Sequence, residues 1–126
     1  MNKQEQILQK TINQYCLYNK IPFYCINNNV VPPVIDGVYN RNFAIKQAVK
    51  NKTMGLKKGV ADAFIIYGNK TIFIEFKTAT GKQKPEQKEF ENICKSNNQD
   101  YFIVRSFEDF ERILGSCFAD CQVLLK

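Results

Sequence analysis

The stretch VADAFIIYGNKTIFIEFK, residues 60–77, decides the expected fold of this chain. Two runs rich in β-branched and aromatic residues flank Gly68-Asn69. A two-residue loop that begins with glycine between such runs predicts a β-hairpin with a type II′ turn. We therefore expect strands at residues 60–67 and 71–77, close to the middle of the chain.

The hairpin also predicts which side chains meet. Counting back from a two-residue loop at positions 68–69 places Asp62 opposite Glu75, with their Cβ atoms about 4.5–5.5 Å apart. Facing like charges are unfavourable unless a cation compensates them. Because side chains alternate between the two faces of a strand, Lys77 shares the face of Glu75. Two carboxylates and one amine are therefore expected on one patch.

This trio suits hydrolysis of phosphodiester bonds. Hard divalent cations such as Mg²⁺ bind carboxylate oxygens and complete their shell with water and substrate phosphate. Lys77 could then orient or deprotonate the attacking water. The chain has no histidine, so catalysis must use carboxylates, lysine or a metal. The plain alternative is a solvated strand face on which Lys77 forms an ordinary salt bridge; Phe64 and Phe73, expected on the same face, weaken it.

Length and charge bound the remaining choices. A chain of 126 residues with 44% hydrophobic content fits one domain, residues 1–126. Its 18 Lys and Arg against 12 Asp and Glu give a net charge of +6, which favours a polyanionic partner or serves solubility alone.

Membrane and thiol chemistry are expected to play little part. No stretch approaches the roughly 20 apolar residues that span a bilayer, and residues 1–10 are polar, so we expect a soluble, intracellular (cytoplasmic) protein with no membrane partner. The five cysteines contain no CxxC pair and are expected to be reduced and mostly structural. Cys117 and Cys121 form only a weak CxxxC signal for metal.

The other predicted elements complete an α/β domain with a central mixed sheet flanked by helices. Apolar spacing, caps and breakers predict helices and strands in the remaining segments, with a long loop where asparagines and prolines cluster. The expected helices are residues 4–18, 42–54, 85–96 and 106–114, the expected strands are residues 21–26 and 101–104, and the expected loop is residues 27–39; residues 115–126 are ambiguous.

The hairpin and its surroundings resemble a known family. Asp62, the span to Glu75-Phe76-Lys77 and the following helix with Gln87 resemble the PD-(D/E)xK nuclease superfamily, and in particular its VRR-NUC branch. The segment GLKKGVAD at residues 55–62 is similar to that family's glycine-rich approach to its aspartate. The resemblance covers nearly the whole chain and is closest to small stand-alone members, many of them from phages.

The resemblance implies a restriction-endonuclease-like fold and a Mg²⁺- or Mn²⁺-dependent DNA endonuclease. It implies that Asp62, Glu75 and the Phe76 carbonyl bind the metal, that Lys77 assists the water and that Gln87 supports the site. Glu5 matches, in a less certain register, an acidic residue of the family's first helix that approaches the metal. Small relatives resemble junction-resolving enzymes and pair into homodimers, which implies a branched DNA substrate.

Two departures from the family pattern concern geometry. Ala61 stands where a proline is usual, and Lys84 replaces a small hydroxyl residue before the helix at Pro85 and is a poorer cap. The glycines at 55–59 and 81 lack the GK[ST] ending of a P-loop, so no nucleotide cofactor is expected.

Basic residues near the site are candidate contacts to the phosphate backbone, although any single one could equally belong to a solvated surface. Two other functions stay open: a nucleic-acid-binding module without catalysis, and a nuclease directed at RNA. The candidate backbone contacts are Arg41, Lys46, Lys50, Lys52, Lys57 and Lys58.

Overall fold

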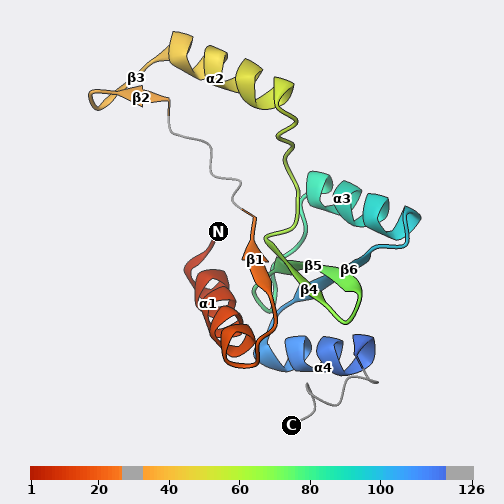
Figure 1. Ribbon diagram of the computed structural model, residues 1–126. Coiled ribbons are helices and arrows are strands. Elements are labelled where there is room, and N and C mark those ends of the chain that lie inside the picture. Colours follow the sequence, from red (N-terminus) through yellow and green to blue (C-terminus); the bar gives the residue numbers. More distant parts are fainter. Residues whose placement is uncertain (27–32, 119–126) are drawn as a thin grey trace.

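A four-stranded mixed sheet forms the centre of the computed structural model, which describes residues 1–26 and 33–118 (Figure 1). The order β1-β4-β5-β6 has two antiparallel pairs, β1 with β4 and β4 with β5, and one parallel pair, β5 with β6. The expected mixed sheet is therefore confirmed. Its strands are β1 (Phe23–Cys25), β4 (Ala63–Tyr67), β5 (Lys70–Phe76) and β6 (Asp100–Val104).

The central hairpin has the expected alignment but a different turn. Ala63 faces Ile74, and the pairing continues without a break to the loop. Gly68 and Asn69 both have positive φ, 58° and 64°. Two positive φ angles are typical of a type I′ turn, so the predicted type II′ turn is wrong. The register is unaffected because both turn types have two loop residues.

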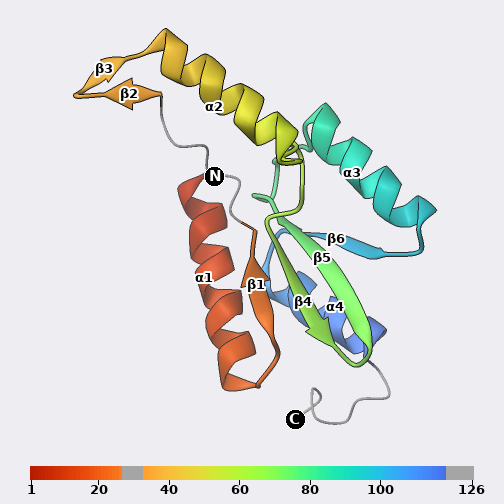
Figure 2. The same ribbon diagram turned by 45° about the horizontal axis from the view of Figure 1, so that its top comes forward.

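Helices cover the sheet in two layers (Figure 2). The helices α1 (Lys3–Tyr18) and α4 (Phe107–Cys117) pack on one face, and α3 (Pro85–Ser96) packs on the other, beside β6. The larger core lies under α1 and α4 and contains Ile12, Cys16, Ile65, Ile72, Ile74, Phe76, Val104, Phe110 and Leu114.

Local sequence explains where these helices begin. The Asn2 side chain accepts hydrogen bonds from the first backbone amides of α1, and Ser106 Oγ accepts one from Asp109 N at α4. The helix α3 has the predicted bounds, and its Ile93 is 53% exposed, although the apolar spacing of this helix predicts that Ile93 faces the core. Glu91 is buried in α3 and is held by ion pairs to lysines 88 and 95, each 2.9 Å long.

The segment from residue 33 to residue 56, here called the arm, projects from the sheet (Figures 1 and 2). It consists of a small hairpin, β2 (Val34–Ile35) and β3 (Val38–Tyr39), followed by α2 (Arg41–Thr53) and a short connection. Sequence analysis predicted a loop over residues 27–39. That prediction is wrong for the described part, because residues 36 and 37 form a tight turn with φ of 52° and 78°; residues 27–32 lie outside the described residues.

The helix α2 confirms the prediction of a helix in this segment but contributes nothing to the core. Asn40 caps it by accepting a hydrogen bond from Phe43 N, and Gly55 follows its end with a φ of 87°. None of its side chains is fully buried. Its apolar residues are therefore left on the surface.

The cysteines and the C-terminal segment were also the subject of sequence predictions, as was the absence of a membrane-spanning segment. Within residues 1–26 and 33–118, Cys16, Cys25, Cys94 and Cys117 are free thiols. Among these residues no helix is long and apolar enough to cross a bilayer. The ambiguous tail begins as part of α4, which extends to Cys117; Cys121, and with it the CxxxC pair, lies outside the described residues.

Candidate functional site

Asp62 and Glu75 meet at the end of the central hairpin. The register of β4 and β5, extended by one residue, places them opposite one another. The Asp62 side chain raises the pKa of Glu75 by hydrogen bonding and by its charge, so the two carboxyl groups lie close enough to compete for one proton. Asp62 Oδ2 also accepts a hydrogen bond of 2.8 Å from Phe76 N, the residue after Glu75. The structure therefore brings the two predicted carboxylates together.

The Glu75 carboxyl lies in an environment that opposes its ionisation. Its side chain is buried, with an exposed fraction of 1%. Burial is the largest cause that raises the pKa of Glu75, to about 9, and the hydrogen bond and charge of Asp62 add to it. Lys77 lowers this pKa in part, whereas Glu5 raises it. At neutral pH the pair therefore holds a proton that a cation could replace.

One oxygen of Glu75 has no partner. Oε1 is buried and makes no hydrogen bond, which is uncommon for a buried polar atom and calls for an explanation. An orphaned carboxylate oxygen beside a second carboxylate fits a hard divalent cation, which binds oxygen ligands. In the described part of the chain no group of three or more His, Cys, Asp or Glu side chains could hold a metal. A metal here would therefore have two side-chain ligands and would need main-chain, water or phosphate oxygens as well.

Lys77 is held beside the carboxylates by the first turn of α3. It is only 8% exposed, and its Nζ donates a 2.9 Å hydrogen bond to Gln87 Oε1. The same oxygen accepts a 2.8 Å hydrogen bond from Lys84 N, so Gln87 both orients Lys77 and caps α3. This contact replaces the missing hydroxyl cap at position 84, since the lysine side chain makes no cap hydrogen bond.

Gly59 allows the segment before Asp62 to lie against α3. A Cβ atom at this position would overlap the Glu86 carbonyl and lie 2.9 Å from Gln87 N, and the residue has a φ of 86°. Only glycine fits both conditions. The glycine-rich approach seen in the sequence therefore has a packing role that its pattern alone did not show.

Glu5 and Phe76 occupy different positions relative to the pair. Glu5 lies in the first turn of α1, where its Oε2 accepts a 3.2 Å hydrogen bond from Asn2 N. It is close enough to influence Glu75 electrostatically, but its own hydrogen bond is to the helix cap. The Phe76 side chain is buried in the core under α1 and α4, and its amide binds Asp62.

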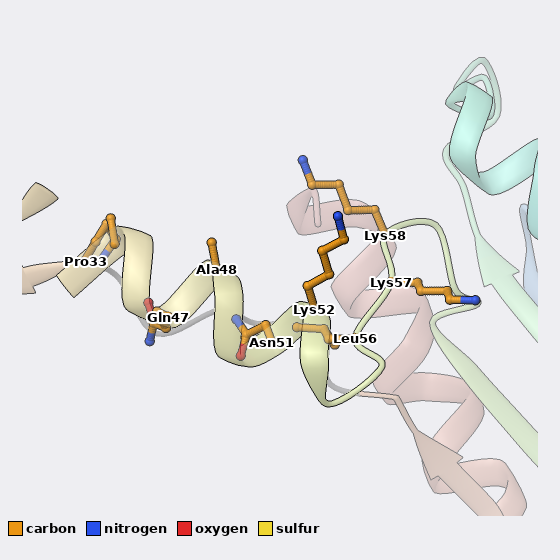
Figure 3. Close-up of a pocket in the computed structure, with 9 residues that line it drawn as sticks. Pro33, Gln47, Ala48, Asn51, Lys52, Leu56, Lys57 and Lys58 are labelled. Atoms are coloured by element: carbon orange, nitrogen blue, oxygen red, sulfur yellow. The ribbon is translucent and has the colours of Figure 1, made fainter. Parts of the chain in front are cut away.

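The predicted basic residues lie on α2 and on the segment that follows it, and they differ in which hollows they line. Lys58 borders a hollow of about 320 Å³ that Asp62 and Gln87 also line. It borders a second hollow of about 420 Å³ beside α2, where Figure 3 shows Lys52 and Lys58 reaching out on the same side and Lys57 pointing elsewhere. The other predicted contacts, Arg41, Lys46 and Lys50, are exposed on α2 and line neither hollow.

Sequence reasoning treated Lys84 only as a helix cap and did not place Lys84, Glu86 or Tyr101 at the site. Lys84 and Glu86 line the same hollow as Asp62. Burial raises the pKa of Tyr101 and the charge of Glu75 raises it further, which places this phenol near the carboxylates; its Oη accepts a 3.2 Å hydrogen bond from Gln83 Nε2. No spacing in the sequence signals these neighbours, because α3 and the parallel strand β6 bring them in.

Comparison with known proteins identified no relative of this chain. No family model matches the chain, and no significantly similar curated protein or solved structure was found.

Proposed function

We propose that this protein is a nuclease that uses Mg²⁺ or Mn²⁺ to hydrolyse phosphodiester bonds in DNA. The observation that carries the proposal is the meeting of Asp62 with the buried Glu75, whose Oε1 has no partner, within one small region that also contains Lys77. A buried carboxyl in this state needs either a proton or a cation.

Each residue has a separate task in the proposed reaction. Asp62, Glu75 and the Phe76 carbonyl would hold the metal, which when bound polarises the phosphate and acidifies a water molecule. Lys77 places its ammonium group beside the phosphate and the attacking water, where it offsets developing negative charge. Gln87 fixes the Lys77 side chain by its 2.9 Å hydrogen bond. Glu5 contributes negative charge that strengthens attraction for a cation.

The proposed fold and family follow from the same features. The carboxylates lie on a central hairpin of a mixed sheet with helices on both faces, an arrangement that agrees with a restriction-endonuclease-like domain. We accordingly propose membership of the VRR-NUC branch, on the residues that resemble it. This assignment is an analogy at the level of fold and motif.

The proposed substrate is DNA with a branch or junction. Lys52, Lys57 and Lys58 line the hollow beside α2, and Lys58 also lines the hollow at Asp62. This basic path supports contact with a phosphate backbone.

The reduced thiols and the nucleic-acid substrate agree with action in the cytoplasm of a bacterial or phage-infected cell.

The arm supports pairing of two copies of this chain. Large apolar side chains are exposed along β2, β3, α2 and the connection that follows, and surface of this kind marks sites of association. Pairing would present two active sites to the two strands of a branched substrate. The exposed residues are Val34, Ile35, Val38, Tyr39, Ile45, Val49, Met54 and Leu56.

Cleavage assays test the nuclease assignment directly. Wild type, Lys77→Ala and the control Lys70→Ala are incubated with Mg²⁺ or Mn²⁺ and with duplex, flap and junction substrates, each in DNA and RNA form. Lys70 is exposed at the hairpin turn, away from the carboxylates. We expect Lys77→Ala to lose at least about a hundredfold in rate and Lys70→Ala to remain active.

Other outcomes assign the function differently. Equal activity of Lys77→Ala and wild type would show that Lys77 has no catalytic role and that the proposed catalytic site is wrong. Binding without cleavage under every metal indicates a nucleic-acid-binding module, and preference for RNA redirects the proposal to an RNA nuclease. Light scattering at the assay concentration tests the dimer: symmetric cutting of a junction by a monomer contradicts it.

A further inference from the structure

We propose that Tyr24 and Phe64 form a stacking platform for an unpaired base next to the carboxylate pair. The site then prefers a strand whose nucleotides beside the cleaved phosphate are single-stranded. This inference rests on the proposed function, since it assigns the substrate class of the same site.

A row of aromatic rings crosses the sheet one step from the carboxylates. Tyr24 and Phe64 face one another across β1 and β4, with ring centroids 5.1 Å apart and planes inclined by 22°. Phe64 faces Phe73 across β4 and β5, and their centroids are 6.1 Å apart. Phe73 in turn pairs with Tyr101 of β6. The row therefore spans all four strands on one face.

The carboxylates occupy the next row of the same face. Asp62 precedes Phe64 by two residues, and Glu75 follows Phe73 by two. Two residues along a strand correspond to about 7 Å, and residues two apart share a face. A phosphate held at Asp62 and Glu75 thus has the aromatic row within the reach of its neighbouring nucleotide.

The two ends of the aromatic row differ in exposure. Phe90 of α3 covers one end, with edge-on contacts to Phe73 at 5.4 Å and to Tyr101 at 5.9 Å. The other end lies on β1 and β4, where Tyr24 is 49% and Ile66 is 47% exposed. In the described part of the chain, α3 contacts β6 but does not extend over β1 (Figure 2). Among residues 1–26 and 33–118, Tyr24 is therefore the half-exposed aromatic side chain of the row, beside the site.

The basic residues around the site indicate which kind of ligand would stack on Tyr24 and Phe64. The hollow at Asp62 is bordered by Lys58 and Lys84, and the chain carries a net charge of +6, so the ligand that lies over this region is expected to be a polyanion. An aromatic surface beside a basic path is the combination that single-stranded nucleic acids use, because every unpaired base offers a face for stacking. Bases inside a duplex are already stacked on one another and offer no free face.

Binding measurements without cleavage test this proposal separately from the nuclease assignment. An oligonucleotide with 2-aminopurine in a single-stranded flap is titrated in EDTA, next to a fully duplex probe of equal length. The variants are Tyr24→Ala, Tyr24→Leu and Tyr24→Phe, and Tyr18→Ala is the control, because Tyr18 is exposed at the end of α1. Circular dichroism melts and light scattering check that each variant keeps its fold and its mass.

Stacking predicts a specific pattern of affinities. Base stacking on one aromatic ring is worth about 1–3 kcal/mol, which corresponds to roughly a 5- to 150-fold change in affinity. We expect Tyr24→Ala and Tyr24→Leu to bind the flap at least about fivefold more weakly, with loss of 2-aminopurine quenching, and Tyr24→Phe and Tyr18→Ala to stay within about twofold of wild type. Duplex affinity is expected to stay unchanged in all four.

Three results would overturn the inference. If Tyr24→Ala binds the flap as tightly as wild type, Tyr24 does not form a stacking platform. Equal losses on flap and duplex indicate a general contact instead of an unpaired base. A change of mass in Tyr24→Ala shows that a second copy of the chain covers this face. If cleavage is absent from wild type while the flap-specific pattern holds, the nuclease assignment fails and the platform stands.

Discussion

Replacement of Glu75 by glutamine should stabilise the metal-free protein. The Glu75 carboxyl has a pKa of about 9 in the folded chain, compared with an ordinary value of 4.5. Between these two values the unfolded chain has released this proton while the folded chain still holds it. The folded state therefore loses stability as the pH rises from 4.5 to 9, and a neutral glutamine removes that loss.

The size of the effect follows from the shift. Each unit of pKa difference corresponds to about 1.4 kcal/mol, so at pH 7.5 the upper limit is about 4 kcal/mol, and at pH 5 it is below about 1 kcal/mol. Local relaxation reduces these limits, and we expect a gain of about 1–3 kcal/mol at pH 7.5. Glutamine also offers an amide N–H to the Asp62 carboxylate, in place of the proton that Glu75 holds at this pH.

Urea unfolding in EDTA at pH 5 and pH 7.5 measures this gain. The control is Glu89→Gln, an exposed residue of α3, for which no pH-dependent difference is expected. The same titrations with Mg²⁺ add a second readout: the metal should stabilise wild type, increasingly as the pH rises, but not Glu75→Gln. A Glu75→Gln protein that is less stable than wild type in EDTA, or equally changed at both pH values, would refute the reasoning.

Three further perturbations test the surroundings of the site. Gln87→Ala should lower the cleavage rate about 10- to 100-fold with little change in substrate affinity, since the Lys77 ammonium loses its orienting partner; an unchanged rate in a steady-state assay contradicts this role. Gly59→Ala should lower the free energy of unfolding in urea by more than about 2 kcal/mol, and Gly55→Ala by only about 1 kcal/mol. Both residues have positive φ, but only Gly59 lies against the α3 backbone. Equal losses for the two variants would show that the contact with α3 is unimportant. Lys58→Ala should reduce by about one the slope of log DNA affinity against log salt concentration, because one phosphate contact is lost. Lys10→Ala on α1 should leave this slope unchanged. Equal slopes for the two variants would show that Lys58 does not contact a phosphate.

The sequence by itself determined the central hairpin and the meeting of its carboxylates. A two-residue loop between apolar runs allows only one simple alignment, and that alignment is observed from Ala63 and Ile74 to the turn. Apolar spacing and breakers are likewise local signals, and the helices predicted at residues 4–18 and 85–96 appear close to these bounds as α1 and α3. Contacts between neighbours in sequence depend on local geometry alone.

Local reasoning failed where several conformations satisfy the same pattern. The turn at Gly68-Asn69 could be type I′ or type II′ by its residues, and only the backbone angles distinguish the two. In α3, Glu91 is buried with ion pairs to two lysines whereas Ile93 is exposed, the reverse of what their polarity alone predicts. The small hairpin at residues 34–39 was obscured by the asparagines and prolines that precede it.

Only the tertiary structure decided how the site is surrounded. The contact of Gly59 with the first turn of α3, the hydrogen bond that fixes Lys77 on Gln87, and the position of Tyr101 all join segments that are distant in sequence. The burial of Glu75, the largest cause of its raised pKa, also depends on packing between distant segments, and Glu5 of α1 raises that pKa further by its charge. Sequence spacing specifies which groups can share a strand face, but burial and partners depend on how the other layers pack against that face.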